Sequence, residues 1–508
     1  MNDRRRVRRF LILMGALGCL SAADISPPVA PAVWELNLRQ TLFQALESNR
    51  QLRVQRLTPA ITETAIGNQQ AAFDPLLSAS IATKRQATPG SSSTAAGNPD
   101  GGNARADALT AEVAIEQTLA TGTSWSLDAA TTRQRSDFYD DASVVTRTGL
   151  TINQALLKGA SISANLAGIH QARIDLDISR FELRGYTQAL VAEVEATYWD
   201  HALAVQQTAI VERALAVAQQ QLEQVKAFIA AGKIAGIELA AAEAEVAVRG
   251  GYVIDARSNR ALTRLHLLRL LNPPGEKPLT RELRLIDMPF VPVGICDPVD
   301  IHVAVALRLR PDLNQARLQV ERGDLDVVRT RNGLLPRLDF FVNLGRSGYA
   351  ASFARSIPGD EGRGWDAQAG VRFAHTLGNR EADSSHRQAQ LSSEQIALVL
   401  AHQEQLAEAD VRAAEIEVER LKEQLAATAV TRRAQEAKAS AEREKFRVGK
   451  STTLQMEQAE RDALTSHLDE VRAVVNHLKA LVELYRLDGS LLERRGIAAP
   501  GGETKILE

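Results

Sequence analysis

The segment Phe446-Arg447-Val448-Gly449-Lys450-Ser451 divides a long proline-free stretch, residues 378–487, in which Gly449 is the only internal glycine. Glycine adopts positive φ without steric cost, so the chain turns most easily there. On both sides, apolar residues recur every three or four positions, the spacing of a coiled-coil seam. The stretch predicts two long helices, the first on the order of 100 Å at about 1.5 Å per residue. The seam residues are Val411, Ala414, Val418, Leu421, Leu425, Leu464, Leu468, Val471, Val475, Leu478, Val482 and Tyr485.

An earlier hairpin, residues 160–271, has the same design, with its turn at Gly232 and Lys233. It also lacks proline, and its apolar residues again step by three and four. Two hairpins in one register indicate an internal duplication. The residues that match at the seventh, tenth and eleventh positions after each turn glycine are Leu239 and Met456, Ala242 and Ala459, and Glu243 and Glu460.

Shorter helices precede each hairpin. Asn37 and Gln40 form a capping-box pattern that predicts a helix over residues 38–48. A second helix over residues 51–73 ends at Pro75. The later counterpart is shifted by a constant 261 residues and ends at Pro336, so both prolines mark helix-to-strand junctions. The other matching pairs are Ala45 and Ala306, Leu46 and Leu307, Leu52 and Leu313, Arg56 and Arg317, and Leu57 and Leu318.

After each proline the hydrophobic period changes to two, which predicts strands with one apolar and one mostly polar face. A soluble sandwich would bury the apolar face against a second sheet, whereas a membrane barrel would turn it to lipid. Charges on the other face favour the barrel. These charges are Glu112, Glu116, Asp339 and Arg372. The alternating segments are 77–83, 109–115, 125–129, 144–152, 338–344 and 365–373.

The first half is longer than the second in this region. Pro75 and Pro336 are 261 residues apart, but Gly159 and Gly378, where each sheet region returns to helix, are 219 apart. The difference between these two spacings leaves room for one additional hairpin over residues 107–133. The expected connections are 89–102 and 347–364, both long polar external loops, and Ala120-Thr121-Gly122-Thr123, a tight inner turn.

The N-terminus has the features of a secretory signal, residues 1–23: arginines, an apolar run too short to span a bilayer, and Ser21-Ala22-Ala23. Export predicts an envelope or extracellular address. Cys19 is a candidate lipidation site, although the usual leucine three residues earlier is missing. The alternative is a cysteine removed with the signal, which leaves Cys296 without an intramolecular disulfide partner.

The composition excludes several function classes. A net charge of −2 gives no sign of nucleic-acid binding. The nine histidines are scattered, and no metal-ligand spacing, phosphate-binding loop or nucleophile elbow is present, so we expect no enzyme, no metal and no cofactor. Asp137, Asp140 and Asp141 are interpreted as a solvated loop, with weak cation binding as the alternative. The predicted organisation begins with a signal, residues 1–23, and a first repeat, residues 36–271, which contains short helices 38–73, strands 76–157 and a hairpin 160–271. A linker, residues 272–298, leads to a second repeat, residues 299–488, which contains short helices 301–334, strands 337–376 and a hairpin 380–488. The chain ends in a tail, residues 489–508.

This order of elements resembles the TolC-like outer membrane efflux protein family over residues 36–489. The resemblance rests on Leu36-Asn37-Leu38, Phe73-Asp74-Pro75-Leu76, Leu335-Pro336-Arg337-Leu338, Leu156-Leu157-Lys158-Gly159 and the two Gly-Lys turns. It implies a mostly α-helical homotrimer with membrane β-structure, in which duplicated half-repeats build a shared outer-membrane β-barrel continued by a long periplasmic α-helical barrel. Four strands per subunit are expected from the family.

The resemblance also implies a function: a passive exit duct for efflux or type I secretion, supplied by an inner-membrane pump through a periplasmic adaptor. The adaptor would dock at the helix-turn tips, which carry Gly232, Lys233, Phe446, Gly449 and Lys450. Solvated lysines beside a C-capping glycine are the plainer interpretation. Drug, metal and protein cargo all remain open.

The tips also depart from the family pattern, which often places acidic residues six and nine positions beyond the second turn glycine. Gln455 and Gln458 stand there. Our hypothesis is that Glu238, at the sixth position of the first hairpin, supplies the negative charge of the pore constriction. The alternative is an ordinary surface glutamate.

A rival from another class is a structural or adhesive coiled-coil protein of the envelope. It explains the heptads and the signal, but not two strand sets placed identically in a duplicated chain. Detergent dependence separates the two, because a conduit needs detergent to stay dispersed and a soluble rod does not.

Overall fold

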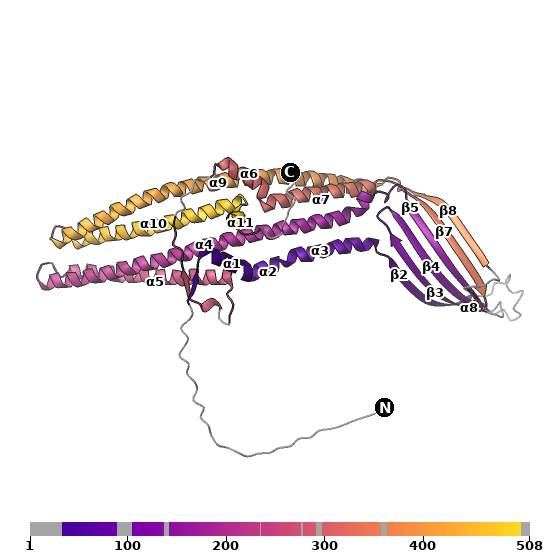
Figure 1. Cartoon of the computed structure of the whole chain (residues 1–508), viewed down its shortest axis with the longest axis horizontal. Helices are drawn as coiled ribbons and strands as arrows, with labels where there is room; N and C mark the ends of the chain where they lie inside the picture. The colour runs from indigo at the N-terminus through magenta and orange to yellow at the C-terminus, as the bar shows by residue number, and fades with distance from the viewer. Residues whose placement is uncertain are drawn as a thin grey trace, which may run out of the picture.

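The computed structural model describes residues 33–88, 104–136, 142–233, 235–275, 278–290, 297–356 and 363–498. The molecule is elongated, with helices along most of its length and a six-stranded sheet at one end (Figure 1). The predicted signal with Cys19, the aspartates 137, 140 and 141, and Cys296 lie outside the described residues. Of the helices in those ranges, none combines the length and apolarity needed to cross a membrane.

Two long helical hairpins form as predicted. The first is α4 (Ile162–Ala230) with α5 (Glu238–Leu271), and the second is α9 (Arg380–Arg447) with α10 (Thr453–Leu487). They run side by side with both turns at the end remote from the sheet (Figure 1). The turn of the first hairpin extends beyond Gly232 and Lys233, and α5 begins only at Glu238, whose N–H donates to the Ala235 carbonyl at 3.1 Å.

The predicted seam residues of the second hairpin are buried or half-buried, and Val411, Val418 and Val475 have at most 2% exposure. The two long first helices nevertheless differ. Twenty-five of the 69 residues of α4 are buried, against five of the 68 residues of α9. The reason is that α4 packs on α3, α5, α7 and α10, so it is surrounded within one chain. Much of α9 is left uncovered.

The short helices confirm the duplication in atomic detail. Helices α1 (Leu38–Ser48) and α2 (Arg50–Gln55) meet at Asn49, and α6 (Val299–Leu309) and α7 (Pro311–Gly333) meet at Arg310, with nearly equal backbone angles at the two joints. The predicted capping box at Asn37 is present. The predicted second helix, however, turns at Arg56, continues as α3 (Leu57–Gln70) and ends in a 3-10 turn, Ala71–Phe73.

An arginine bonds the preceding helix identically in both halves. Arg56 Nη2 donates to the Leu46 carbonyl at 3.1 Å, and Arg317 Nη2 donates to the Leu307 carbonyl at 2.8 Å. These are the pairs expected from the 261-residue shift. The repeat therefore preserves contacts within this chain as well as element order.

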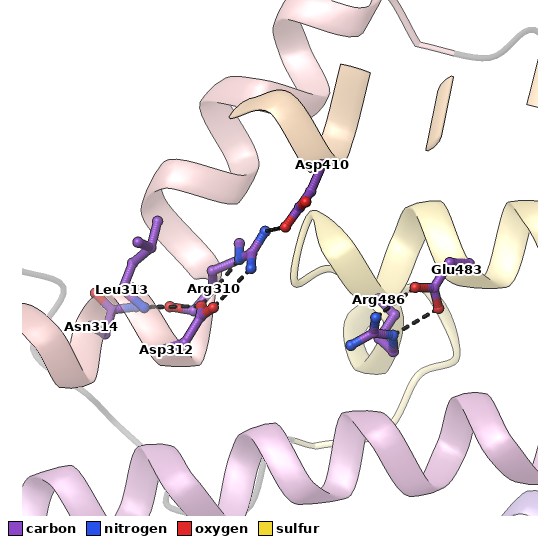
Figure 2. A network of polar contacts seen from close by, with 7 residues as sticks. All are labelled: Arg310, Asp312, Leu313, Asn314, Asp410, Glu483 and Arg486. Carbon is purple, nitrogen blue, oxygen red and sulfur yellow. Dashed lines mark hydrogen bonds and ion pairs between the residues drawn. The ribbon is translucent and has the colours of Figure 1, made fainter. Parts of the chain in front are cut away.

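The joint at Arg310 carries a polar network that differs from the contacts at Asn49 (Figure 2). Arg310 donates to Asp312 of α7 at 2.8 Å and to Asp410 of α9 at 3.2 Å, while Asp312 accepts from the Leu313 N–H at 2.9 Å. Asn49 instead caps its own helix and donates to the Leu270 carbonyl at 3.0 Å. Equivalent joints are thus fastened to different long helices.

The main apolar core lies midway along the molecule, where α1, α4, α5 and α10 meet. The predicted linker contributes a strand, β6 (Leu283–Leu285), which pairs in parallel with β1 (Trp34–Leu36), and a 3-10 turn, Pro278–Thr280. The predicted tail contributes α11 (Leu491–Arg494), whose Leu491 and Leu492 are fully buried. Linker and tail are therefore parts of the core rather than connectors.

The sheet is an antiparallel meander of six strands, so the expectation of four strands per subunit was wrong. The additional hairpin predicted from the chain length is β3 with β4. The predicted loop from residue 347 starts only after Ala350, where a short helix α8 (Phe353–Ser356) follows. The strands, in sheet order, are β2 (Leu76–Thr88), β3 (Ala104–Thr118), β4 (Thr123–Ser136), β5 (Ser143–Ala155), β7 (Arg337–Ala350) and β8 (Arg363–Ala374).

The register places the alternating residues on common faces. Val113 pairs with Ala79 and Ala129, and Val342 pairs with Ile152 and Ala369, so one apolar face runs across the whole sheet. The predicted charges share the opposite face, where Asp339 pairs with Arg372 and Glu112 with Ser80.

Candidate functional site at the helix tips

The two hairpin turns have the same backbone geometry. Gly232 and Gly449 have φ of +69° and +73°, the left-handed conformation in which glycine ends a helix. In each turn, the N–H groups of the glycine and of the following lysine donate to carbonyls of the last helical turn. The donor and acceptor pairs are Gly232 to Ile229 (2.9 Å), Lys233 to Phe228 (2.9 Å), Gly449 to Phe446 (3.0 Å) and Lys450 to Lys445 (2.8 Å).

An aromatic contact joins the two tips. The ring centroids of Phe228 and Phe446 are 6.3 Å apart, and Lys233 Nζ lies 5.4 Å from the centroid of Phe228. Lys450 is exposed beside them. The structure therefore brings together, at one end of the molecule, the residues that sequence analysis assigned to the tips.

The start of α10 uses one of the predicted constriction residues for another purpose. Gln455 closes a capping box with Thr452: its N–H donates to Thr452 Oγ1 at 3.3 Å, and its side chain accepts from the Thr452 N–H at 3.4 Å. Ser451 Oγ donates to Glu442 at 2.8 Å and so ties the turn to α9. Gln458, one turn further along, is exposed.

Glu238 stands in the first turn of α5 and is half-buried. A carboxylate there interacts favourably with the positive end of the helix dipole. This interaction gives Glu238 a structural role, which is compatible with the plainer interpretation of a surface glutamate. The geometry by itself assigns it to no pore.

Sequence analysis missed a buried ionic cluster between the hairpins, close to the tips. Arg249 Nε donates to Glu245 Oε1 at 2.8 Å within α5, and their side chains are only 6% and 8% exposed. Arg461 of α10 reaches the other oxygen of Glu245 at 3.5 Å. Glu457, one turn before Arg461, is 6% exposed. Ionic side chains thus lie where α5 and α10 meet.

A signal for this cluster exists in the sequence. Ala242, Glu245, Arg249 and Val253 step by three and four and are all buried, so the two charged residues occupy seam positions. Charged residues are rarely buried unless paired. A search for opposite charges within the seam would have found the pair.

The cluster perturbs the ionisation of Glu457. Burial raises the pKa of its carboxyl above the ordinary value, and the carboxylates of Glu245 and Glu238 raise it further. The guanidinium groups of Arg461 and Arg249 oppose this rise. Glu457 is therefore easier to protonate than an ordinary glutamate.

Each hairpin is also held together by its own ion pairs. In the second hairpin Arg432 of α9 lies 2.5 Å from Glu470, Lys438 lies 2.8 Å from Asp462, and Arg443 pairs with Glu460. In the first, Arg257 lies 2.8 Å from Glu212. Most of these side chains are partly exposed, so each pair contributes little individually.

The junction prolines lie where predicted, directly before β2 and β7. The Pro336 carbonyl accepts from the Lys158 N–H at 3.2 Å, which joins the end of the first strand set to the start of the second. Among the residues that the structure describes, no three histidine, cysteine or acidic side chains gather as a metal site.

The comparisons with known proteins agree with this geometry. Residues 303–490 match the family described as outer membrane efflux protein. The second repeat therefore matches an outer membrane efflux protein domain, and the resemblance found in the sequence is confirmed. That family consists of channels, not enzymes. No curated protein sequence matches the chain.

Solved outer-membrane channels share the fold. The chain is similar to the outer-membrane channel OprN (TM-score 0.66, 19% identity, 89% of this chain and 90% of that one) and to the Campylobacter jejuni CmeC channel (0.66, 13%, 89% and 86%). It is also similar to the open state of the Neisseria gonorrhoeae MtrE channel (0.59, 18%, 89% and 89%). At these identities the likeness establishes the fold.

Proposed function

We propose that this chain is one subunit of a homotrimeric exit duct in the outer membrane, which passively conducts solutes delivered by an inner-membrane pump and a periplasmic adaptor. The observation that carries the proposal is an open sheet that continues directly into helices of 68 and 69 residues. In a single chain the sheet has unpaired edges and the helices have uncovered apolar faces. The family match and the fold of OprN and CmeC support it.

The sheet needs further copies. Its outer strands β2 and β8 each have one paired neighbour, and six strands are too few to enclose a lumen. Its apolar face is exposed, with Ile81 at 75% and Trp365 at 81%. Pairing β8 of one subunit with β2 of the next would close the wall and place this face against outer-membrane lipid.

The long helices also need neighbours. Leu398, Ile416 and Val430 of α9 are exposed by 66%, 66% and 64%, and Ile254 and Leu262 of α5 are similarly uncovered. In the proposed trimer these faces pack against one another and form a tube through the periplasm. The length, about 100 Å at about 1.5 Å per residue, suits that path.

The tips would be the gate and the docking site. In the closed state the Phe228–Phe446 contact and the cluster of Glu245, Arg249, Glu457 and Arg461 would hold the two hairpins together. Opening would separate the hairpins at these contacts. Glu238 and Gln458 would face the constriction, and Lys233 and Lys450 would meet the adaptor. The MtrE channel has an open state, so this fold permits opening.

Reconstitution tests the duct. Purified protein should require detergent, cross-link as a trimer, and conduct ions across a planar bilayer. A water-soluble monomer that conducts nothing would instead favour the structural coiled-coil alternative and end the proposal.

Adaptor docking has a separate test. Lys233→Glu combined with Lys450→Glu should abolish efflux in cells while bilayer conductance persists, because only docking is lost. Arg213→Glu, on an exposed face of α4 far from the tips, is the matched control. Equal efflux in all three strains would reject docking at these lysines.

A further inference from the structure

The additional hairpin of the first half is fully incorporated in the sheet. β2 is paired with β3 over the whole length of β2, from Leu76–Glu116 to Thr88–Ala104, and β4 pairs with β3 and β5 over comparable lengths. We propose that the trimer, on which this inference rests, closes a barrel of eighteen strands instead of twelve. Its outer-membrane lumen is then wider than that of a twelve-stranded barrel, so bulkier cargo can pass through it.

The inner turn of the hairpin is built into the junction with the helices. Gly122 has φ of +77°, and a side chain there would collide with the Gly159 carbonyl. The Ala155 N–H donates to the Gly122 carbonyl at 3.0 Å. Asn165 of α4 donates to the carbonyls of Ala120 at 2.8 Å and Gly159 at 2.7 Å. The turn thus occupies a fixed place above α4.

Both faces of the hairpin continue those of the neighbouring strands. Leu109, Val113 and Leu127 extend the exposed apolar face. Glu112, Glu116 and Asp128 lie on the opposite face, which also carries the ion pair of Arg147 with Asp366 at 2.8 Å. That pair crosses β7 at Gly345, where a side chain would collide with both partners. A hairpin that lay outside the barrel would not continue both the apolar and the polar face of the sheet.

The width of the helical part of one subunit agrees with the width of a six-stranded sheet. Near the junction, α3, α4, α7 and α9 of each subunit pack side by side, since α4 contacts α3 and α7, and α7 contacts α9. At about 9–10 Å each, four helices span roughly 36–40 Å. Six strands at about 4.8 Å, tilted by about 40°, span roughly 38 Å, whereas four span roughly 25 Å. Six strands therefore continue the tube without narrowing it.

The estimate for the closed barrel follows. Eighteen strands give a backbone diameter of about 36 Å, against about 24 Å for twelve. Inward side chains leave a lumen radius of roughly 12 Å for eighteen strands and roughly 6 Å for twelve. The class of cargo that this barrel passes is therefore bulky hydrated solutes, and selection by size falls to the helix tips.

Cysteine labelling tests the wall directly. In the reconstituted trimer, Glu112→Cys on β3 should react with a water-soluble charged thiol reagent, and Val113→Cys only with a lipid-dissolved maleimide. Asn343→Cys and Val342→Cys on β7 form the matched control pair, and labelling of wild-type Cys19 and Cys296 is subtracted. Equal aqueous labelling of both β3 variants, with alternation kept on β7, would overturn the inference alone. Loss of alternation on β7 would overturn the proposed duct as well.

Polymer exclusion supplies the second measurement. Poly(ethylene glycol) of hydrodynamic radius about 10 Å, added from the external side, should enter the barrel and lower single-channel conductance, because it fits only the wider lumen. A cut-off at about 6 Å, the radius of a twelve-stranded lumen, in a channel that conducts normally would contradict eighteen strands. Absence of any channel would count against the proposed function.

Discussion

The two halves of this chain share a helical skeleton but not a sheet. The long first helices α4 and α9 have 69 and 68 residues, and the returning helices α5 and α10 have 34 and 35. The glycines that precede α4 and α9, Gly159 and Gly378, have φ of +90° and +91°. Yet the first half contributes four strands and the second two. Helix length is constrained because both hairpins must reach the same tip, whereas a meander accepts one more hairpin wherever both new edges find partners.

The halves also differ in how they are covered. The first hairpin is enclosed by its own chain, while much of α9 is exposed. The duplicated element that sequence matching treats as equivalent therefore has two environments. In the proposed trimer, α9 would depend on neighbouring subunits more than α4 does.

The largest expected effect comes from equivalent core leucines. Leu52 and Leu313 are 1% and 0% exposed at matched positions. Replacing either by alanine should lower the free energy of unfolding by about 3–5 kcal/mol, because each change leaves a cavity. Val54→Ala, at a site 59% exposed, is the control with a change within about 0.5 kcal/mol. Denaturant titration measures all three, and a clear inequality between the leucine variants would show that the halves are not equivalent here.

The next effect is specific to the first half and depends on pH. Burial, together with the nearby charges of Arg260 and Arg264, lowers the pKa of His201 to about 4. The unfolded state then binds more protons between about pH 6.5 and 4, so stability is complete above 6.5 and is lost as the pH falls to 4. The loss should be about 3 kcal/mol, since each pKa unit is worth about 1.4 kcal/mol.

His201→Gln should flatten this dependence in thermal unfolding followed across that pH range. His402→Gln, at an exposed position of α9, is the control that should leave the slope unchanged. An unchanged slope in the His201 variant would refute the assignment.

Turn glycines should give a smaller difference between the halves. Gly122→Ala, in the turn found only in the first half, combines positive φ with a collision and should cost about 2–3 kcal/mol. Gly449→Ala has positive φ but open space, so about 1 kcal/mol is expected. The yield of heat-resistant trimer under identical expression would rank them, and the reverse order would argue against a built-in hairpin.

The smallest effect concerns the cluster between the hairpins. Glu457→Gln mimics the protonated side chain and should lower open probability roughly three- to tenfold, about 1 kcal/mol. Wild-type opening should increase as the pH rises through the raised pKa of Glu457, because ionisation adds a buried negative charge beside Glu245. Arg249→Met should instead favour opening. Single-channel recordings between about pH 5 and 8 decide, and a pH response that survives in Glu457→Gln would exclude this residue.

Much of the architecture follows from local sequence. The absence of proline, the seam spacing and two turn glycines determined the hairpins, because long helices need little else to be specified. The period of two determined the strands and their faces, since successive side chains point to opposite sides. The unequal spacing of prolines and glycines in the two halves located the extra hairpin. The expectation of four strands, which came from the family resemblance, was the part that was wrong.

Only the tertiary structure decided which distant segments of the chain contact one another. That linker residues 283–285 pair with residues 34–36, and that Glu245 of one hairpin meets Arg461 of the other, depends on how distant segments pack, which no local pattern encodes. Gln455 is a different case, because the capping box that it closes with Thr452 is a local pattern, like that of Asn37 with Gln40. The hydrophobic period of a helix or strand shows which of its faces is buried. Only the folded chain determines which other segment that face packs against.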